Sequence, residues 1–106
     1  MEEYLIVLIT APNEEEASNI AKELVADRLA ACVNIVRNLR SIYRWQGRIE
    51  DEGEVLMIAK TRRSLFGALQ NKVKELHSYT VPEIIALPIV AGSEDYLKWL
   101  GGETQQ

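Results

Sequence analysis

Short runs of apolar side chains predict the strands of this chain. Tyr4 to Ala11 is almost continuously apolar and rich in branched residues, which is typical of a central strand. Two further runs, Val55 to Ala59 and Ile84 to Val90, follow later in the sequence. Pro88 lies inside the last run. Because proline has no amide hydrogen to donate, we expect that strand at a sheet edge or at a bulge.

Apolar positions three or four residues apart predict three helices. Asn13 is the expected cap of the first helix, with Glu16 completing a capping box, and this helix ends near Asp27-Arg28. The apolar faces of the three helices are, in order, Ala17, Ile20, Ala21, Leu24 and Val25; Leu65, Leu69, Val73 and Leu76; and Tyr96, Leu97 and Leu100.

Serine residues precede the second and third helical patterns. Ser64 is the expected cap of the second helix, and Ser93 is the expected cap of the last one. Because glycine is a poor helix former, Gly101-Gly102 is expected to end the last helix. Glu103 to Gln106 then follow, and we expect them to be frayed.

The segment from Ala30 to Thr61 is predicted to form two long strands joined by a turn at Gln46-Gly47. The arm from Cys32 to Trp45 would span about 46 Å, at roughly 3.3 Å per residue. A compact domain of this length is only about 34 Å across. The hairpin therefore either bends sharply or extends beyond its domain. Because an isolated ribbon is marginally stable in water, we expect other copies of the chain to cover it.

A two-residue turn at Gln46-Gly47 sets the pairing of the two arms. Arg44 would lie diagonal to Asp51, close enough for an ion pair. Tyr43 and Trp45 would share one face. This aromatic pair is either an anchor in a subunit contact or a platform for a ligand.

The order of elements is strand-helix-strand twice, followed by a helix. This is the split arrangement of the ferredoxin-like fold, an α+β fold, and we expect one such domain over residues 1–106. Two helices would cover one face of a four-stranded sheet. A sheet buried on one side should alternate apolar and polar residues, but Val55 to Ala59 does not. We therefore expect another copy of the chain on the second face.

Composition limits the classes of partner and location. The 106 residues carry a net charge of −4, so we expect no nucleic-acid partner, which would need a concentrated basic face. Met1-Glu2-Glu3-Tyr4 is acidic where a secretory signal would be basic. Leu5 to Ile9 is too short to cross a bilayer, so we expect no membrane partner. Cys32 is the only cysteine, which excludes an internal disulfide and favours the cytoplasm.

His77, Glu83 and Cys32 are the candidate metal ligands. His77 either ligates a metal or transfers a proton, with Glu83 as a second ligand or orienting group, or it caps the last turn of its helix. Acid–base catalysis by His77 and Glu83 is a further interpretation. Cys32 is either a soft ligand for copper or zinc, or a small filler of the core. Because one Cys and one His cannot complete a tetrahedral site, a strong site would need carboxylates or residues from a neighbouring copy.

The run Glu50 to Glu54 is rich in carboxylates. It either holds a hard cation or forms a solvated hairpin arm that resists edge pairing, and its spacing matches no calcium loop. The sequence has no Gly-x-Ser-x-Gly nucleophile motif and no glycine-rich phosphate loop.

Several stretches together resemble the CutA family of divalent-cation tolerance proteins. They are Thr10-Ala11-Pro12, Leu29 to Asn34, Ser41 to Gly47, Ile58 to Thr61, Leu76 to Ile84 and Tyr96 to Leu100. The resemblance implies a ferredoxin-like subunit in a tight homotrimer, related in shape to the PII nitrogen-signalling proteins. It also implies a cytoplasmic role linked to copper and other divalent cations, with no enzymatic activity. Some members carry a Cys at the position of Ile9 and a His at that of Leu76, so only His77 keeps that ligand set here.

Two hypotheses follow for the function. The first is a trimeric, non-enzymatic cation-response protein that binds divalent metal weakly near His77 and Glu83 at a subunit boundary. The second is a PII-like sensor that binds an anionic metabolite in the cleft between subunits. In that case the ligand-binding residues would be Tyr43, Arg44, Trp45 and Lys60.

Overall fold

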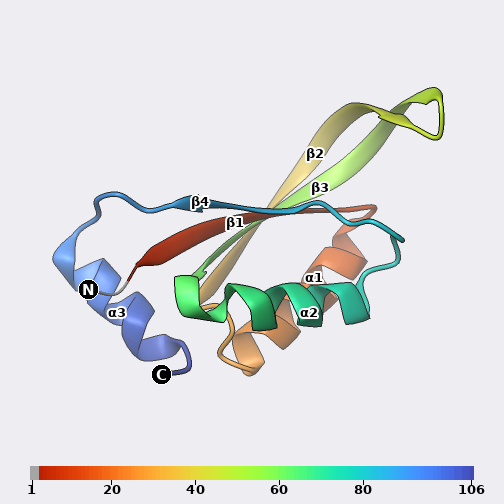
Figure 1. Ribbon diagram of the computed structural model, residues 1–106. Coiled ribbons are helices and arrows are strands. Elements are labelled where there is room, and N and C mark those ends of the chain that lie inside the picture. The colour runs from red at the N-terminus through yellow and green to blue at the C-terminus, as the bar shows by residue number, and fades with distance from the viewer. Residues whose placement is uncertain (1–2) are drawn as a thin grey trace.

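Four strands form one sheet, and two helices cover one of its faces (Figure 1). The computed structural model describes residues 3–106, so the start of the acidic segment, Met1 and Glu2, lies outside the described residues. The elements are β1 (Tyr4–Ala11), α1 (Glu14–Ala26), β2 (Cys32–Trp45), β3 (Arg48–Arg62), the 3₁₀ helix η1 (Arg63–Leu65), α2 (Phe66–Leu76), β4 (Ile84–Pro88) and α3 (Glu94–Glu103).

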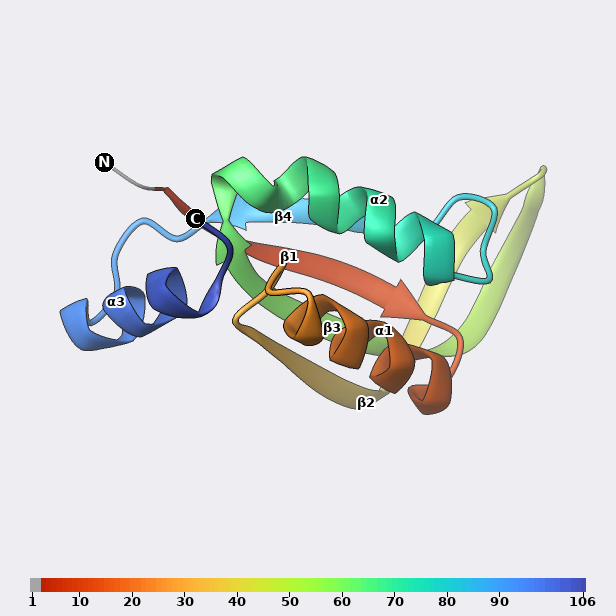
Figure 2. The same cartoon turned by 90° about the horizontal axis from the view of Figure 1, so that it is seen from below.

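The strand order is β2-β3-β1-β4, and every neighbouring pair is antiparallel. This order, with α1 and α2 side by side below the sheet, is the predicted ferredoxin-like arrangement, which is confirmed (Figure 2). The position of β4 at the sheet edge is also confirmed. The strand ends at Pro88 rather than at Val90, although the Ile89 amide still donates to the Tyr4 carbonyl at 2.9 Å.

The core lies between the helices and the lower face of the sheet. Alternate residues of β1 and β3 point into the core. The residues between them point to the opposite face of the sheet and are also mostly apolar, so each strand carries an unbroken apolar run. The buried core side chains include Val7, Ile9, Ile20, Leu24, Met57, Leu69 and Val73.

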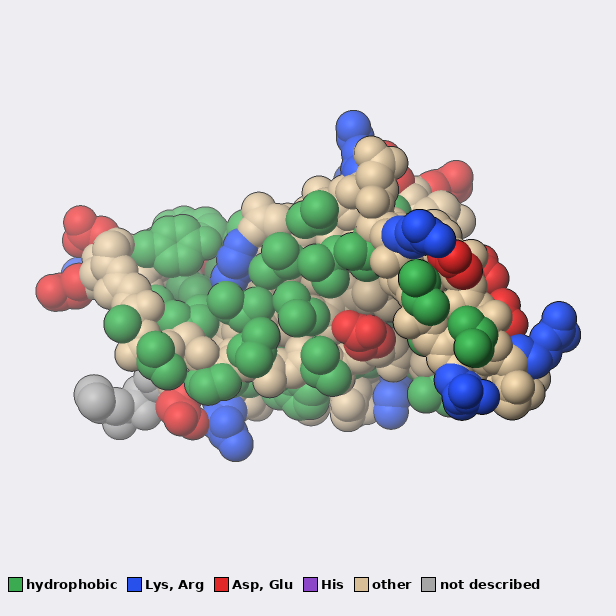
Figure 3. Space-filling model, turned by 90° about the horizontal axis from the view of Figure 1, so that it is seen from above, with side chains coloured by type: hydrophobic (Ala, Val, Ile, Leu, Met, Phe, Trp, Pro, Cys, Tyr) green, Lys and Arg blue, Asp and Glu red, His purple; other side chains and the backbone are tan. Residues whose placement is uncertain are grey.

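The upper face of the sheet is also apolar (Figure 3), and no helix of residues 3–106 lies over it (Figure 1). Strand alternation and register place two apolar residues from each of β1, β3 and β4, and Val36 from β2, on this face. Ile85 and Leu87 of β4 are 53% and 51% exposed there. We call this surface the open face; its apolar residues are Ile6, Leu8, Val36, Leu56, Ile58, Ile85 and Leu87.

The β2–β3 hairpin projects beyond the rest of the molecule (Figure 1). Its turn is at Gln46 and Gly47, as predicted, and both residues have positive φ angles, 50° and 78°, as a type I′ turn requires. A bulge bends β2 where Arg37 and Asn38 together face Val55. The hairpin therefore both bends and extends, and it gives the molecule a long axis of 44 Å.

The predicted ion pair between Arg44 and Asp51 is wrong. Arg40 binds Asp51 instead, with Nε and Nη2 donating to the two carboxylate oxygens at 2.8 and 2.6 Å. Gly53 lies opposite Arg40 and leaves room for the guanidinium to reach across, whereas Ile49 lies opposite Arg44. The Arg40 guanidinium holds the pKa of Asp51 below its ordinary value.

Two of the predicted helix caps are confirmed, and one is wrong. The side chains of Asn13 and Ser93 accept hydrogen bonds from the amides three residues ahead, at 2.8 and 3.2 Å. Ser64 does not cap α2, because the chain first makes the turn η1 and Leu65 occupies the cap position. The Glu16 carboxylate does not complete a capping box but binds Ser78, in the loop after α2.

The prediction that the last residues are frayed is wrong. α3 continues through Gly101-Gly102 to Glu103, and Thr104 is fully buried. Arg28 donates to the Gly102 carbonyl at 2.7 Å, and Arg62 donates to the Gly101 carbonyl and to the Thr104 hydroxyl. These contacts come from residues far away in the sequence, so the local composition did not indicate them.

The two glycines of α3 give a matched test of this packing. A Cβ on Gly101 would lie 2.6 Å from the Tyr4 hydroxyl, whereas a Cβ on Gly102 would have nothing within 4 Å. We expect Gly101→Ala to lower the free energy of unfolding by about 1–3 kcal/mol. Gly102→Ala should be neutral, or stabilising by at most about 1 kcal/mol. Urea denaturation at one fixed protein concentration measures both, and equal midpoints would contradict the packing described here.

Candidate functional site

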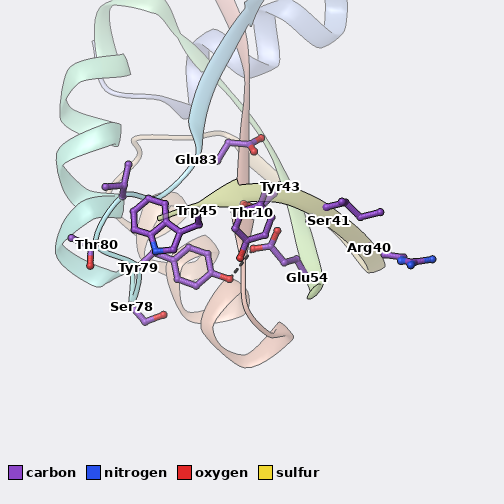
Figure 4. A pocket seen from close by; sticks show the side chains of 12 residues that line it. Thr10, Arg40, Ser41, Tyr43, Trp45, Glu54, Ser78, Tyr79, Thr80 and Glu83 are labelled. Atoms are coloured by element: carbon purple, nitrogen blue, oxygen red, sulfur yellow. Dashed lines mark hydrogen bonds between the residues drawn. The ribbon is translucent and has the colours of Figure 1, made fainter. Parts of the chain in front are cut away.

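A groove of about 740 Å³ lies at the junction of the hairpin, the end of β1 and the loop between α2 and β4 (Figure 4). Three aromatic side chains and two carboxylates are among the groups that line it. The lining residues that matter below are Thr10, Tyr43, Trp45, Glu54, Tyr79 and Glu83.

Glu54 and Tyr79 form the polar contact at the base of this groove. The Tyr79 hydroxyl donates to Glu54 Oε2 at 2.7 Å, and the bond joins the loop after α2 to β3 (Figure 4). Glu54 is buried, with only 7% of its surface exposed. Burial and the neighbouring Glu54 carboxylate raise the pKa of Tyr79 well above its ordinary range, so its hydroxyl stays protonated near neutral pH.

His77 lies behind the groove and uses both ring nitrogens inside the protein. Its Nε2 is 2.7 Å from the Thr10 carbonyl, and the Tyr79 amide donates to its Nδ1 at 3.0 Å. A carbonyl can only accept and an amide N–H can only donate, so these partners assign the neutral ring with the proton on Nε2. His77 also ends α2, because its amide donates to the Val73 carbonyl. It therefore joins α2, β1 and the loop together.

Glu16 completes the contacts of this loop. Its Oε2 accepts from the Ser78 amide and hydroxyl, both at 3.0 Å, and lies 3.4 Å from His77 Nδ1. Residues 77–79 are thus held by α1, β1 and β3 at once, and this fixes the position of the Tyr79 ring.

The structure brings together some of the predicted site residues. Tyr43, Trp45 and Glu83 line the groove, but Arg44 and Lys60 do not. Lys60 lies toward the other end of β3, where it contacts Asn34.

Cys32 lies apart from the groove as well. It pairs with Lys60 at the start of β2, whereas the groove is at the far end of β1. Its side chain is half-buried on the open-face side of the sheet and is not part of the core cluster between the sheet and the helices. Its Sγ lies 3.9 Å from Asn34 Oδ1, and Tyr96 of α3 lies close enough to interact with it.

Glu54 and Tyr79 were missed as members of a site. The carboxylate run at residues 50–54 was interpreted as either a cation site or a solvated arm, but its last member is buried. Strand alternation was a usable signal, because Glu50, Glu52 and Glu54 fall on one side of β3, and Glu50 pairs directly with Tyr43. The contact with Tyr79 spans 25 residues and left no local signal.

The comparison with known protein families matches residues 5–103 to the model described as CutA1 divalent ion tolerance protein. The chain belongs to the CutA1 divalent ion tolerance family.

Individual relatives agree with this membership. The chain is 57% identical over 99 residues to the divalent-cation tolerance protein CutA of Thermus thermophilus, covering 93% of this chain and 96% of that protein. It is 46% identical to the chloroplastic CutA of Arabidopsis thaliana over 95% of this chain, but it spans only 56% of that protein's length. The solved structure of the periplasmic divalent cation tolerance protein CutA from Archaeoglobus fulgidus superposes with a TM-score of 0.93 at 43% identity, covering 96% of this chain and 99% of that one.

The CutA1 chain has no complete metal site of its own in the part that the structure describes. No three His, Cys, Asp or Glu side chains within residues 3–106 are grouped to hold an ion. Ile9, where some family members carry a Cys, is fully buried in the core. Over the same residues, no helix is both long and apolar enough to span a bilayer.

The bond between Tyr79 and Glu54 can be tested by removing one hydroxyl. We expect Tyr79→Phe to lower the free energy of unfolding by about 1–3 kcal/mol, because it leaves the buried Glu54 carboxylate without its donor. Tyr43→Phe is the matched control, since it removes a hydroxyl from the same groove for which no hydrogen bond is recorded. Chemical denaturation at neutral pH measures both variants. If they are equally stable, the bond does not support the loop.

Proposed function

We propose that this CutA1 chain acts in divalent-cation tolerance as a non-enzymatic, cytoplasmic homotrimer. We further propose that it binds copper or a similar cation weakly where subunits meet. The observation that carries the proposal is the open face, an apolar sheet surface that no element of the described chain covers. The names of its relatives as divalent-cation tolerance proteins support the cation role.

The open face supports self-association because apolar surface is costly to leave in water. Contiguous exposed apolar patches on soluble proteins commonly mark contact sites. The hairpin carries a second apolar surface, since Ile42 and Ile49 are 64% and 70% exposed. Contacts between two different surfaces are head-to-tail and close into a ring when the rotation permits. The family resemblance implies a ring of three.

We expect weak rather than tight metal binding because the candidate ligands are already hydrogen-bonded or lie far apart. His77 would have to release the Tyr79 amide or the Thr10 carbonyl before it could bind a metal. Glu83 is exposed at the groove, and Cys32 is too far along the sheet to join it in one chain. A site built from these residues therefore needs a second subunit.

The anionic-metabolite hypothesis gains no support from the groove. The basic residues that it requires, Arg44 and Lys60, do not line the groove, and two carboxylates do. Arg40, which does line it, is already paired with Asp51.

A charged residue on the open face should disrupt the trimer. We expect Leu87→Lys to shift the solution mass from about three copies of the 12.0 kDa chain toward one, because the lysine would have to be buried unpaired. Val25→Lys is the matched control, since Val25 is similarly exposed but lies on α1, in the helical layer. Sedimentation at micromolar concentration measures the mass. A wild-type protein that sediments as a monomer would refute the trimer.

Copper titration tests the metal site. We expect weak, saturable binding to the wild type, which Glu83→Gln and His77→Gln each weaken by at least about tenfold through loss of a ligand. Glu75→Gln, an exposed carboxylate on α2, is the control and should not change the affinity. Circular dichroism checks that each variant is folded. Equal copper affinity in all four proteins would exclude His77 and Glu83 as ligands.

A further inference from the structure

The groove beside the hairpin combines aromatic faces with buried negative charge. From this arrangement we propose that it binds a small organic ammonium ion, with the charge against Glu54 and Glu83 and the alkyl groups against Tyr43, Trp45 and Tyr79. This ligand class is separate from the divalent cation of the proposed function, and it uses Glu54 and Trp45, which the metal proposal does not.

Glu54 is the strongest argument for a cationic ligand. The carboxylate is buried, and among residues 3–106 the neutral Tyr79 hydroxyl alone donates a hydrogen bond to its side chain. No Lys, Arg or His forms a recorded ion pair with it within residues 3–106. Burying an uncompensated negative charge is unfavourable. A cation in the groove would compensate this charge, and Glu83 at the exposed side adds a second one.

The aromatic residues make an organic cation a better fit than a metal ion. Tyr43 and Trp45 come from β2, and Tyr79 comes from the loop facing it, so their rings line the cavity from two sides (Figure 4). Ring faces attract alkylammonium groups by cation–π interaction, and cages of this type recognise quaternary ammonium ligands. A calcium ion instead takes about six to eight oxygen ligands, more than the four oxygens of two carboxylates.

The size and chemistry of the groove agree with this ligand class. Its volume of about 740 Å³ lies within the range of small-molecule sites, roughly 300–1,000 Å³. The raised pKa of Tyr79 keeps this ring uncharged near neutral pH, so its hydroxyl goes on donating to Glu54 when a cation is bound.

Tetramethylammonium chloride is a suitable probe, titrated into the intact protein at constant ionic strength against sodium chloride. In a Trp99→Phe background, Trp45 is the remaining tryptophan, and we expect its fluorescence to change saturably with the probe and not with sodium. No difference between the two salts would overturn the proposal. If copper binding persists in that case, the proposed function stands and only the ammonium site fails.

Variants assign the site to these residues. We expect Glu54→Gln to weaken tetramethylammonium binding by at least about tenfold in calorimetry, through loss of the buried charge. Trp45→Leu should also weaken it, and Glu75→Gln should leave it unchanged. If Glu54→Gln does not fold, Trp45→Leu decides, because Trp45 is 43% exposed and is not part of the core cluster. Wild-type affinity in folded Glu54→Gln or in Trp45→Leu would refute the site.

Discussion

The structure depends on one imbalance: its sheet has two apolar faces, but the βαββαβ order supplies only two helices to cover them. α1 and α2 both lie on the lower face because each is the crossover between two parallel strands that flank a third: α1 joins β1 to β2 across β3, and α2 joins β3 to β4 across β1. Strand alternation then brings one set of apolar residues from β1, β3 and β4 to the upper face. Burial of that face is worth on the order of 25 cal/mol for each Å² removed from water. In the proposed trimer, association between copies would therefore contribute to the stability of the fold itself.

The groove exists because the loop after α2 is held by polar contacts rather than by packing. Its first residues bind α1, β1 and β3 through Glu16, the Thr10 carbonyl and Glu54. Buried polar networks of this kind specify one arrangement, since any other would leave buried groups unpaired. A rigid loop facing a projecting hairpin leaves a space between them that neither element fills. The same polar contacts occupy both ring nitrogens of His77, the residue whose chemistry most clearly indicated a metal ligand.

Local patterns were sufficient for the fold and insufficient for the site. Gln46-Gly47 between two β-rich arms predicted the turn and the pairing of the arms as far as Leu39 and Glu54, because a two-residue turn determines the pairs that follow it. Beyond them the bulge at Arg37 and Asn38 shifts the register, and the turn does not predict that shift. Asn13 and Ser93 were recognisable as caps for the same local reason. The contacts of Arg40, Glu54 and Thr104 join residues that are far apart in the sequence. The local sequence around each residue therefore did not predict its partner. The predicted cap at Ser64 is wrong because Ser64 lies inside the 3₁₀ turn η1, so that α2 begins only at Phe66. Residue propensities do not predict this shift of the helix start.

The contact between Tyr4 and Gly101 means that the two ends of the fold lie side by side. A short linker could join them, since chains with adjacent ends commonly tolerate circular permutation. New ends opened at Gln46-Gly47 would turn the hairpin into two unconnected strands without removing a single side chain. Such a permutant would separate the entropic role of the turn from the contacts between the arms, which no substitution in the hairpin can do.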